Sequence, residues 1–206
     1  MSAQSIAVSL PPTTLLQKLA LGAGRLAGWG VQIDTPIPDK CVIIGAHHTS
    51  GADFLALMLL AFGGGVRMRW VGKDVFFRPP FGPLLRAIGG VPVDRSQRNQ
   101  FVGQMVQLFA QLPRFRLAIA PEGTRQYSTY WKTGFYHIAR GAQVPILCGY
   151  ADYAAKVVGI GPALMPTGDI ARDFEVIRAF YAGVQGRYPH RHGIVALAPD
   201  KEPARV

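Results

Sequence analysis

The fold is decided by residues 41–60, which read CVIIGAHHTSGADFLALMLL. An apolar, partly β-branched run comes first, a turn of small residues follows, and a longer apolar run comes last. This order predicts a buried strand, a loop and a helix. The loop holds His47 and His48, two of the five histidines in the chain, and Asp53 stands five residues after the second. A reaction site at this loop is the first hypothesis that the sequence offers.

Strands and helices alternate through the middle of the chain. Strands are predicted over 41–46, 67–77 (ending in a turn), 91–93, 115–120 and 144–150, with 152–160 as a hairpin partner. Helices are predicted over 53–62, 81–88, 98–112, 131–142 and 171–184. The alternation predicts an α/β fold, a single domain with a mixed, largely parallel sheet flanked by helices. Because sites in such sheets lie at the carboxyl ends of strands, we expect the loops there to share one crevice.

Length and composition indicate one globular domain. The chain has 206 residues, of which 49% are hydrophobic and 17% charged, a balance that excludes a disordered chain. No run reaches the roughly 20 apolar residues of a membrane span, and the first residues lack the pattern of a signal peptide. Cys41 and Cys148 fall in predicted buried strands, so we expect free thiols and a reducing cytosol.

The formal net charge of +10 is the strongest compositional signal. Between residues 67 and 98 there are seven Lys and Arg residues against two Asp. Such a surface favours nucleic acid, anionic lipid headgroups or phosphorylated small molecules, although solvated arginines also serve solubility alone. The sequence shows neither a nucleic-acid-binding motif nor interleaved stacking aromatics, so we expect no nucleic-acid partner.

Residues 13–28 predict a weak amphipathic helix with internal glycines. Lys18 and Arg25 share one side, and the other side carries three leucines at helical spacing: Leu15, Leu19 and Leu26. Two interpretations stay open: a helix docked on the domain, or a helix lying in a membrane interface.

His48 and Asp53 together suggest general base catalysis. A carboxylate bonded to one ring nitrogen fixes the histidine tautomer and stabilises the imidazolium that forms on protonation. The alternative is structural, because Ser50 and Asp53 have the spacing of a helix capping box. A metal site is not expected, since adjacent histidines seldom bind one ion and no further His/Cys cluster accompanies them.

The turn at residues 121–125, Pro-Glu-Gly-Thr-Arg, follows a predicted strand. Gly123 allows a tight turn or a close approach to a ligand, and Thr124 and Arg125 suit an oxyanion such as phosphate. The alternative is an ordinary turn with a solvated arginine.

Arg95 and Lys73 stand near the ends of two other predicted strands. Each is either half of a surface ion pair, worth under about 1 kcal/mol, or a phosphate ligand. A charge-assisted bond to a buried phosphate contributes about 1.5–3 kcal/mol, so two or three such bases around one crevice hold a phosphorylated substrate well.

Four ordered blocks of the sequence together resemble the glycerolipid acyltransferases, the PlsC-like family of lysophosphatidic acid and glycerol-3-phosphate acyltransferases. The blocks are His48-Thr49-Ser50-Gly51-Ala52-Asp53, Gly90-Val91-Pro92-Val93-Asp94-Arg95, Pro121-Glu122-Gly123-Thr124-Arg125 and Val144-Pro145-Ile146. They lie within residues 42–150, and their order is far more specific than any block alone. The resemblance implies a glycerol-3-phosphate acyltransferase-like fold.

The resemblance also implies a reaction, the transfer of an acyl group to a hydroxyl. His48 is then the general base and Asp53 orients it, while the acceptor oxygen attacks an acyl-CoA or acyl carrier protein thioester without an acyl-enzyme. The acceptor is a lysophospholipid-like glycerol phosphate, and no cofactor beyond the thioester co-substrate is implied. With the arginines facing the acceptor phosphate, the expected substrate-binding residues are Arg95, Glu122, Gly123, Thr124, Arg125 and Lys73.

Two departures from the family leave the acceptor open: members usually carry Asn where His47 stands, and often Ser where Gln126 stands. We expect residues 1–30 to form an extension with the amphipathic helix, and residues 31–206 to form the acyltransferase domain. The protein is then cytoplasmic and peripheral on an anionic membrane surface. The alternatives are a membrane-binding module or a thioester hydrolase that uses the same His/Asp pair; no Gly-x-Ser-x-Gly elbow supports a serine hydrolase.

Overall fold

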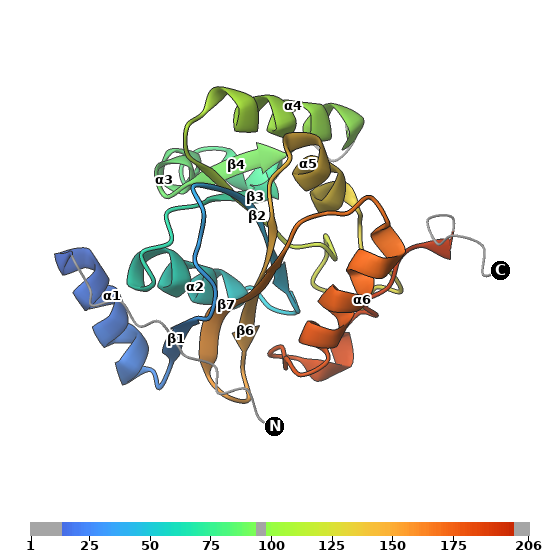
Figure 1. Ribbon diagram of the computed structural model, residues 1–206. Helices are drawn as coiled ribbons and strands as arrows, with labels where there is room; N and C mark the ends of the chain where they lie inside the picture. Colours follow the sequence, from blue (N-terminus) through green and yellow to red (C-terminus); the bar gives the residue numbers. More distant parts are fainter. Residues whose placement is uncertain (1–13, 94–97, 200–206) are drawn as a thin grey trace.

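A seven-stranded sheet forms the centre of the computed structural model, which describes residues 14–93 and 98–199 (Figure 1). The strand order is β1-β7-β6-β2-β5-β3-β4. The strands are β1 (Gly30–Ile33), β2 (Lys40–Ala46), β3 (Arg69–Lys73), β4 (Gly90–Val93), β5 (Phe115–Ile119), β6 (Ile146–Asp152) and β7 (Val157–Leu164). Strands β2 to β6 run parallel to one another, β7 is antiparallel to β6, and β1 is parallel to β7. The predicted single α/β domain with a mixed, largely parallel sheet is confirmed.

Helices cover both faces of this sheet (Figure 1). They are α1 (Leu15–Leu26), α2 (Asp53–Met58), α3 (Gly82–Ala87), α4 (Arg98–Gln111), α5 (Gly134–Ala142) and α6 (Ile170–Tyr181). Three short segments complete the set: the π-helix η1 (Leu59–Gly63) and the 3-10 helices η2 (Asp74–Phe77) and η3 (Pro189–Arg191). One apolar cluster joins α4, α5 and α6 to one sheet face, and a second joins α2, η1 and α3 to the other.

Helix α1 contacts the domain through its small residues. A Cβ built on Gly24 would lie 2.8 Å from Leu59 Cδ1, so the Leu59 side chain packs directly on the helix backbone at this glycine. The helix begins with a capping box between Thr14 and Gln17. Four of its leucines face solvent, among them Leu15, 73% exposed, and Leu26, 93% exposed, whereas Leu21 is partly buried. The helix is therefore docked and amphipathic at once, and a division of the chain at residue 30 stays a prediction.

Several element bounds differ from the sequence prediction by a few residues, and one strand was not predicted. Helix α5 begins at Gly134 and not at Trp131, because the Trp131 and Lys132 N–H groups donate to the carbonyls of Ala196 and Pro121. Strand β1 was not predicted; it is four residues long and pairs with β7, more than a hundred residues away.

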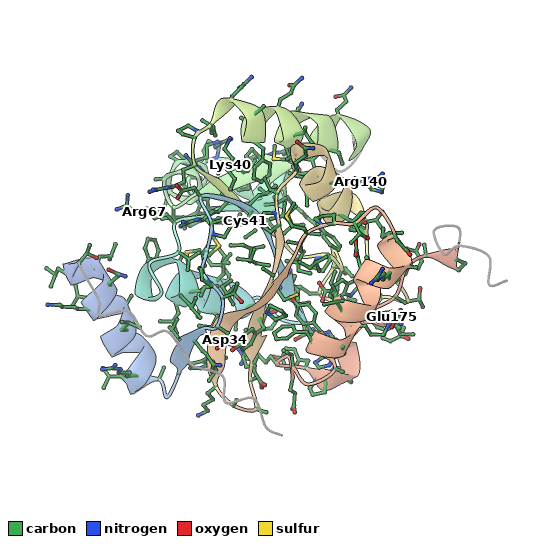
Figure 2. The ribbon with its side chains drawn as sticks, in the orientation of Figure 1. Asp34, Lys40, Cys41, Arg67, Arg140 and Glu175 are labelled. Atoms are coloured by element: carbon green, nitrogen blue, oxygen red, sulfur yellow. The ribbon has the colours of Figure 1, made fainter. Side chains whose placement is uncertain are left out.

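Both cysteines are buried free thiols, as predicted. Cys41 lies in the sheet interior (Figure 2), and burial raises its pKa to about 12 against a smaller opposite effect of Arg116. Burial likewise raises the pKa of Cys148 to about 12. At neutral pH both side chains are therefore protonated, apolar parts of the core.

Candidate active site

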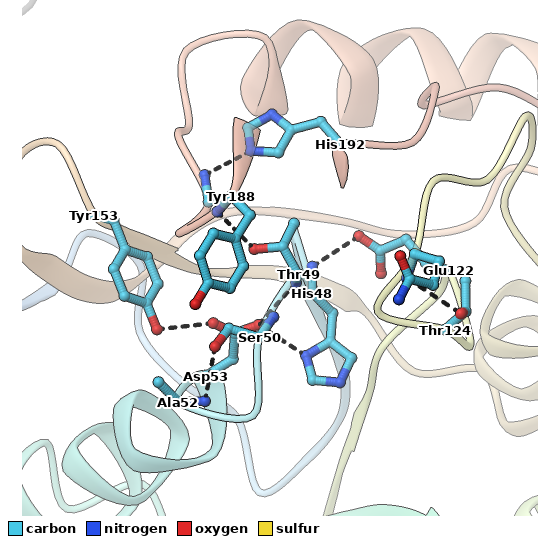
Figure 3. Close-up of polar contacts among 12 residues, drawn as sticks. His48, Thr49, Ser50, Ala52, Asp53, Glu122, Thr124, Tyr153, Tyr188 and His192 are labelled. Atoms are coloured by element: carbon cyan, nitrogen blue, oxygen red, sulfur yellow. Dashed lines mark hydrogen bonds and ion pairs between the residues drawn. The ribbon is translucent and has the colours of Figure 1, made fainter. Parts of the chain in front are cut away.

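The carboxyl ends of β2, β5, β3 and β4 lie at one edge of the sheet, because these four strands are parallel neighbours. The loop with His48 follows β2 and the turn with Glu122 follows β5. A hydrogen bond joins them, since the backbone N–H of His48 donates to Glu122 Oε1 at 3.0 Å (Figure 3). The two loops that the sequence marked therefore form one site.

The imidazole of His48 is paired with Asp53 (Figure 3). Its Nδ1 lies 3.0 Å from Asp53 Oδ2, and the two side chains are 32% and 11% exposed. Because the carboxylate accepts the bond, Nδ1 carries the proton and Nε2 is left with its lone pair. A half-exposed histidine held in this tautomer can remove a proton from a bound hydroxyl, and the carboxylate stabilises the resulting imidazolium.

Asp53 is fixed at both oxygens. Oδ2 also accepts from the backbone N–H groups of Thr49 and Ser50, each at 2.9 Å, and Oδ1 accepts from the Tyr153 hydroxyl at 2.8 Å. Burial alone would raise the pKa of Asp53, but these bonds and the one from His48 outweigh burial and hold it below its usual value. The carboxylate is therefore ionised at neutral pH and cannot rotate freely.

The capping-box alternative holds in part. The Asp53 side chain does accept from the Ser50 N–H, but the Ser50 hydroxyl accepts from Ala52 N at 3.1 Å and not from Asp53 N. Helix α2 itself has no side-chain cap. Asp53 thus organises the loop and orients His48 with the same oxygen, so the structural and catalytic roles coincide.

Glu122 lies beneath the loop and is only 4% exposed. One oxygen accepts from His48, and Oε2 has no hydrogen-bond partner among residues 14–93 and 98–199. Burial raises the pKa of Glu122 to about 7, because the hydrogen bonds from the backbone only partly offset it. A buried carboxyl group with a free oxygen beside the dyad is unusual, since such atoms are normally satisfied.

The remaining predicted ligands lie around this turn or beyond it. Gly123 has a φ of 63°, and a Cβ there would lie 2.6 Å from Lys132 Nζ, so another residue would be strained and would displace the lysine side chain. Thr124 Oγ1 accepts from Gln126 N at 3.2 Å, which shapes the turn. Arg125 is exposed and reaches back to the catalytic loop, where its Nη1 would lie 3.2 Å from a Cβ on Gly51.

Two further predicted ligands are Lys73 and Arg95. Lys73 is exposed at the last residue of β3, on the same sheet edge. Arg95 lies outside the described residues. Substrate contacts by all of these side chains stay predictions.

The sequence prediction missed several residues that contact the loop at residues 47–53 and hold it in place. Besides Tyr153, the Tyr188 N–H donates to Thr49 Oγ1 at 3.2 Å, and His192 stacks on His47 with ring centroids 4.2 Å apart. Tyr153 N in turn donates to Gln185 O at 2.8 Å. The topology was a usable signal for Tyr153, because it follows the carboxyl end of β6, but no pattern singles out Tyr188 or His192.

His47 is a structural neighbour of the dyad. It is 8% exposed, its Nε2 lies 3.4 Å from Tyr181 O, and Nδ1 has no partner. Burial, aided by the His192 ring, lowers the pKa of His47 to about 4. The ring is therefore neutral at physiological pH and packs between the catalytic loop and the C-terminal segment.

An apolar groove opens beside Asp53, between α1 and α2. Its volume is about 480 Å³. The polar end is formed by Tyr153 and Arg187, and the wall is lined by small and aliphatic side chains that include Ala20, Ala23, Leu55 and Met58. The groove is therefore apolar, and Tyr153 in its lining contacts Asp53 of the dyad.

Comparison with known proteins agrees with this geometry. A family model described as Acyltransferase matches residues 30–150, more than half of the chain. The chain belongs to the acyltransferase family. His48, Asp53 and Glu122 fall inside the matched range, whereas Tyr153, Tyr188 and His192, which contact the loop, fall outside it.

The acyltransferase also has a solved structural relative. It is similar to the 1-acyl-sn-glycerophosphate (LPA) acyltransferase PlsC from Thermotoga maritima, with a TM-score of 0.56, 84% of this chain and 79% of that chain covered. The sequences are 16% identical, so the likeness concerns the fold. No curated protein matches the sequence significantly. Within residues 14–93 and 98–199, no helix of the acyltransferase is long and apolar enough to cross a bilayer.

Proposed function

We propose that this acyltransferase moves a fatty acyl group from an acyl thioester to a hydroxyl of a lysophospholipid-like glycerol-phosphate acceptor. The donor is acyl-CoA or acyl carrier protein. The observation that carries the proposal is the His48–Asp53 pair, with Nδ1 held at 3.0 Å by a carboxylate and the other ring nitrogen available as a base.

In the proposed reaction His48 takes up one proton and gives it to the leaving group. Nε2 of His48 removes the proton from the acceptor hydroxyl as its oxygen attacks the thioester carbonyl, and Asp53 stabilises the imidazolium. When the tetrahedral intermediate collapses, the C–S bond breaks and the thiolate leaves with the proton from His48. The products are an ester and a free thiol, and His48 is again neutral.

Two features supply substrate binding in this proposal. The groove between α1 and α2 suits an acyl chain, because it is apolar and ends at Tyr153, whose hydroxyl contacts Asp53. The exposed bases Arg125 and Lys73 suit the acceptor phosphate, and Arg95 joins them by prediction. Glu122 acts through the loop by holding the His48 backbone.

The enzyme works at a membrane surface in this proposal, attached peripherally on the cytoplasmic side. Both substrates carry lipid chains, the exposed leucines of α1 are apolar, and the net charge of +10 favours anionic headgroups. A hydrolase that activates water with the same base is the second candidate, favoured by the same dyad.

The test is the release of free CoA from a long-chain acyl-CoA, measured with and without a lysophospholipid acceptor. We expect release only with acceptor, and its loss in His48→Ala and Asp53→Asn. Ser50→Ala is the matched control from the same loop and should retain turnover. Release that does not depend on acceptor would establish the hydrolase instead.

A further inference from the structure

Residues 74–87, which form η2 and α3, present an exposed apolar surface. Four large side chains within ten residues are at least half exposed: Val75 50%, Phe76 53%, Phe81 67% and Leu84 61%. Scattered exposed apolar residues are normal, but a cluster that contains two phenylalanines marks an interaction surface. We call these four residues the apolar tip.

The apolar tip stands on a fixed base. Phe77, next to the exposed Phe76, is 3% exposed and packs against Trp70 with ring centroids 5.6 Å apart. Arg86 Nη1 donates to the Phe77 carbonyl at 2.9 Å. A Cβ on Gly82 would lie 1.9 Å from that carbonyl oxygen, so the backbone is tightly folded here. Phe77 is therefore packed in the core, whereas Phe76 and Phe81 are held away from it.

Exposed bases flank and interrupt the apolar tip along the sequence. Between residues 67 and 93 the chain carries one carboxylate, Asp74, and five bases: Arg67, Arg69, Lys73, Arg78 and Arg86. Asp74 lies 3.8 Å from Arg78 and offsets only one of them. A segment that combines exposed apolar side chains with an excess of exposed bases is typical of proteins that lie in an anionic lipid interface. A second copy of the chain fits less well, because it would bring the same positive segment face to face.

We propose that the apolar tip inserts into the interface of an anionic bilayer, with Phe76 and Phe81 entering the acyl boundary and the bases meeting the headgroups. This inference rests on the proposed function, which makes both substrates lipids. The inference also extends the proposed function. Lys73, at the end of β3, adjoins the apolar tip in the sequence, so insertion of the tip brings the proposed phosphate-binding edge of the sheet to the membrane.

The test is sedimentation with vesicles of phosphatidylcholine alone or mixed with phosphatidylglycerol. We expect the double variant Phe76→Ala/Phe81→Ala to partition into the mixed vesicles about tenfold or more weakly than the wild type. Arg78→Glu should weaken binding to the anionic vesicles only. The matched control, Met165→Ala/Val176→Ala, removes side chains that are 54% and 48% exposed elsewhere and should bind like the wild type. Thermal unfolding of each variant checks the fold.

Three outcomes would overturn the inference. The first is a double variant that binds as the wild type does. The second is binding lost only on replacing Leu15 and Leu19 of α1. The third is a concentration-dependent dimer that the double variant abolishes, which makes a second copy the occupant. Turnover on detergent-dispersed substrates separates the two proposals: the double variant should keep it, and a wild type that binds vesicles but transfers no acyl group contradicts only the proposed function.

Discussion

Replacing Glu122 by Gln should stabilise the protein at alkaline pH. The pKa of this carboxyl is raised by burial from an ordinary value of 4.5 to about 7. As pH rises through this window the unfolded chain loses its proton first, so stability falls from pH 4.5 upward and the loss is complete above pH 7. The free-energy equivalent of this pKa change is about 3 kcal/mol. Gln stays neutral and keeps an oxygen for the His48 N–H.

The expected difference is therefore pH-dependent. At pH 8 Glu122→Gln should unfold about 5–10 °C higher than the wild type, because a domain of this size gains about 2–4 °C per kcal/mol. At pH 4 the two should nearly coincide, since Glu122 is protonated in both the folded and the unfolded wild type. Thermal unfolding by circular dichroism from pH 4 to 8 measures this difference, in which the other titrating groups cancel.

A surface control separates burial from charge. Glu175, 66% exposed at its side chain, pairs with Arg178, and Glu175→Gln should show no such pH-dependent gain. Glu122→Ala should be less stable than Glu122→Gln at every pH, because it leaves the buried loop N–H without an acceptor at a cost of about 1–3 kcal/mol. A Glu122→Gln difference that is flat with pH, or negative at pH 8, would refute the reasoning.

Three further predictions concern the catalytic loop. Tyr153→Phe removes the one donor that the described part of the chain supplies to Asp53 Oδ1, so the carboxylate should hold the His48 proton more strongly and shift the acidic limb of kcat/KM to higher pH; an unshifted profile would contradict this coupling. Ser50→Ala should cost about 1 kcal/mol in chemical unfolding with turnover kept, because its hydroxyl accepts from the loop backbone; lost turnover at unchanged stability would contradict this. The pKa of His47 is lowered to about 4, so it contributes stability above pH 6.5 that is lost as pH falls toward 4. Between pH 7 and pH 5, the free energy of unfolding measured in urea should therefore fall by about 2 kcal/mol less in His47→Asn than in the wild type. Equal decreases in the two proteins would exclude this role.

Much of the fold follows from local sequence because buried parallel strands read as continuous apolar runs. β2 and β5 are of this kind, and their positions were predicted to within a residue or two. β1 has no such run: it is short, half-buried and defined by pairing with β7, which only the folded chain brings near. The π-turn of η1 within the predicted 53–62 helix likewise has no signature in that apolar sequence.

The candidate site likewise contains residues that local sequence predicts and residues that it does not. His48 and Asp53 are five residues apart, and a loop followed by a helix turn is enough to bring them together. Because the carboxyl ends of parallel strands lie at one edge of the sheet, Glu122 after β5 comes to the same place as the loop after β2. Tyr153 and Tyr188 contact the loop from positions a hundred residues or more further along the chain. No local sequence pattern predicts these contacts.

Detection of the product by mass spectrometry tests the central claim most directly. Wild-type protein, a long-chain acyl-CoA and a panel of lyso-acceptors should give a species with the mass of one acceptor plus the acyl group. His48→Ala, folded to the same melting temperature, should give none. Free fatty acid without acylated acceptor, or an acylated product undiminished in His48→Ala, would contradict the account.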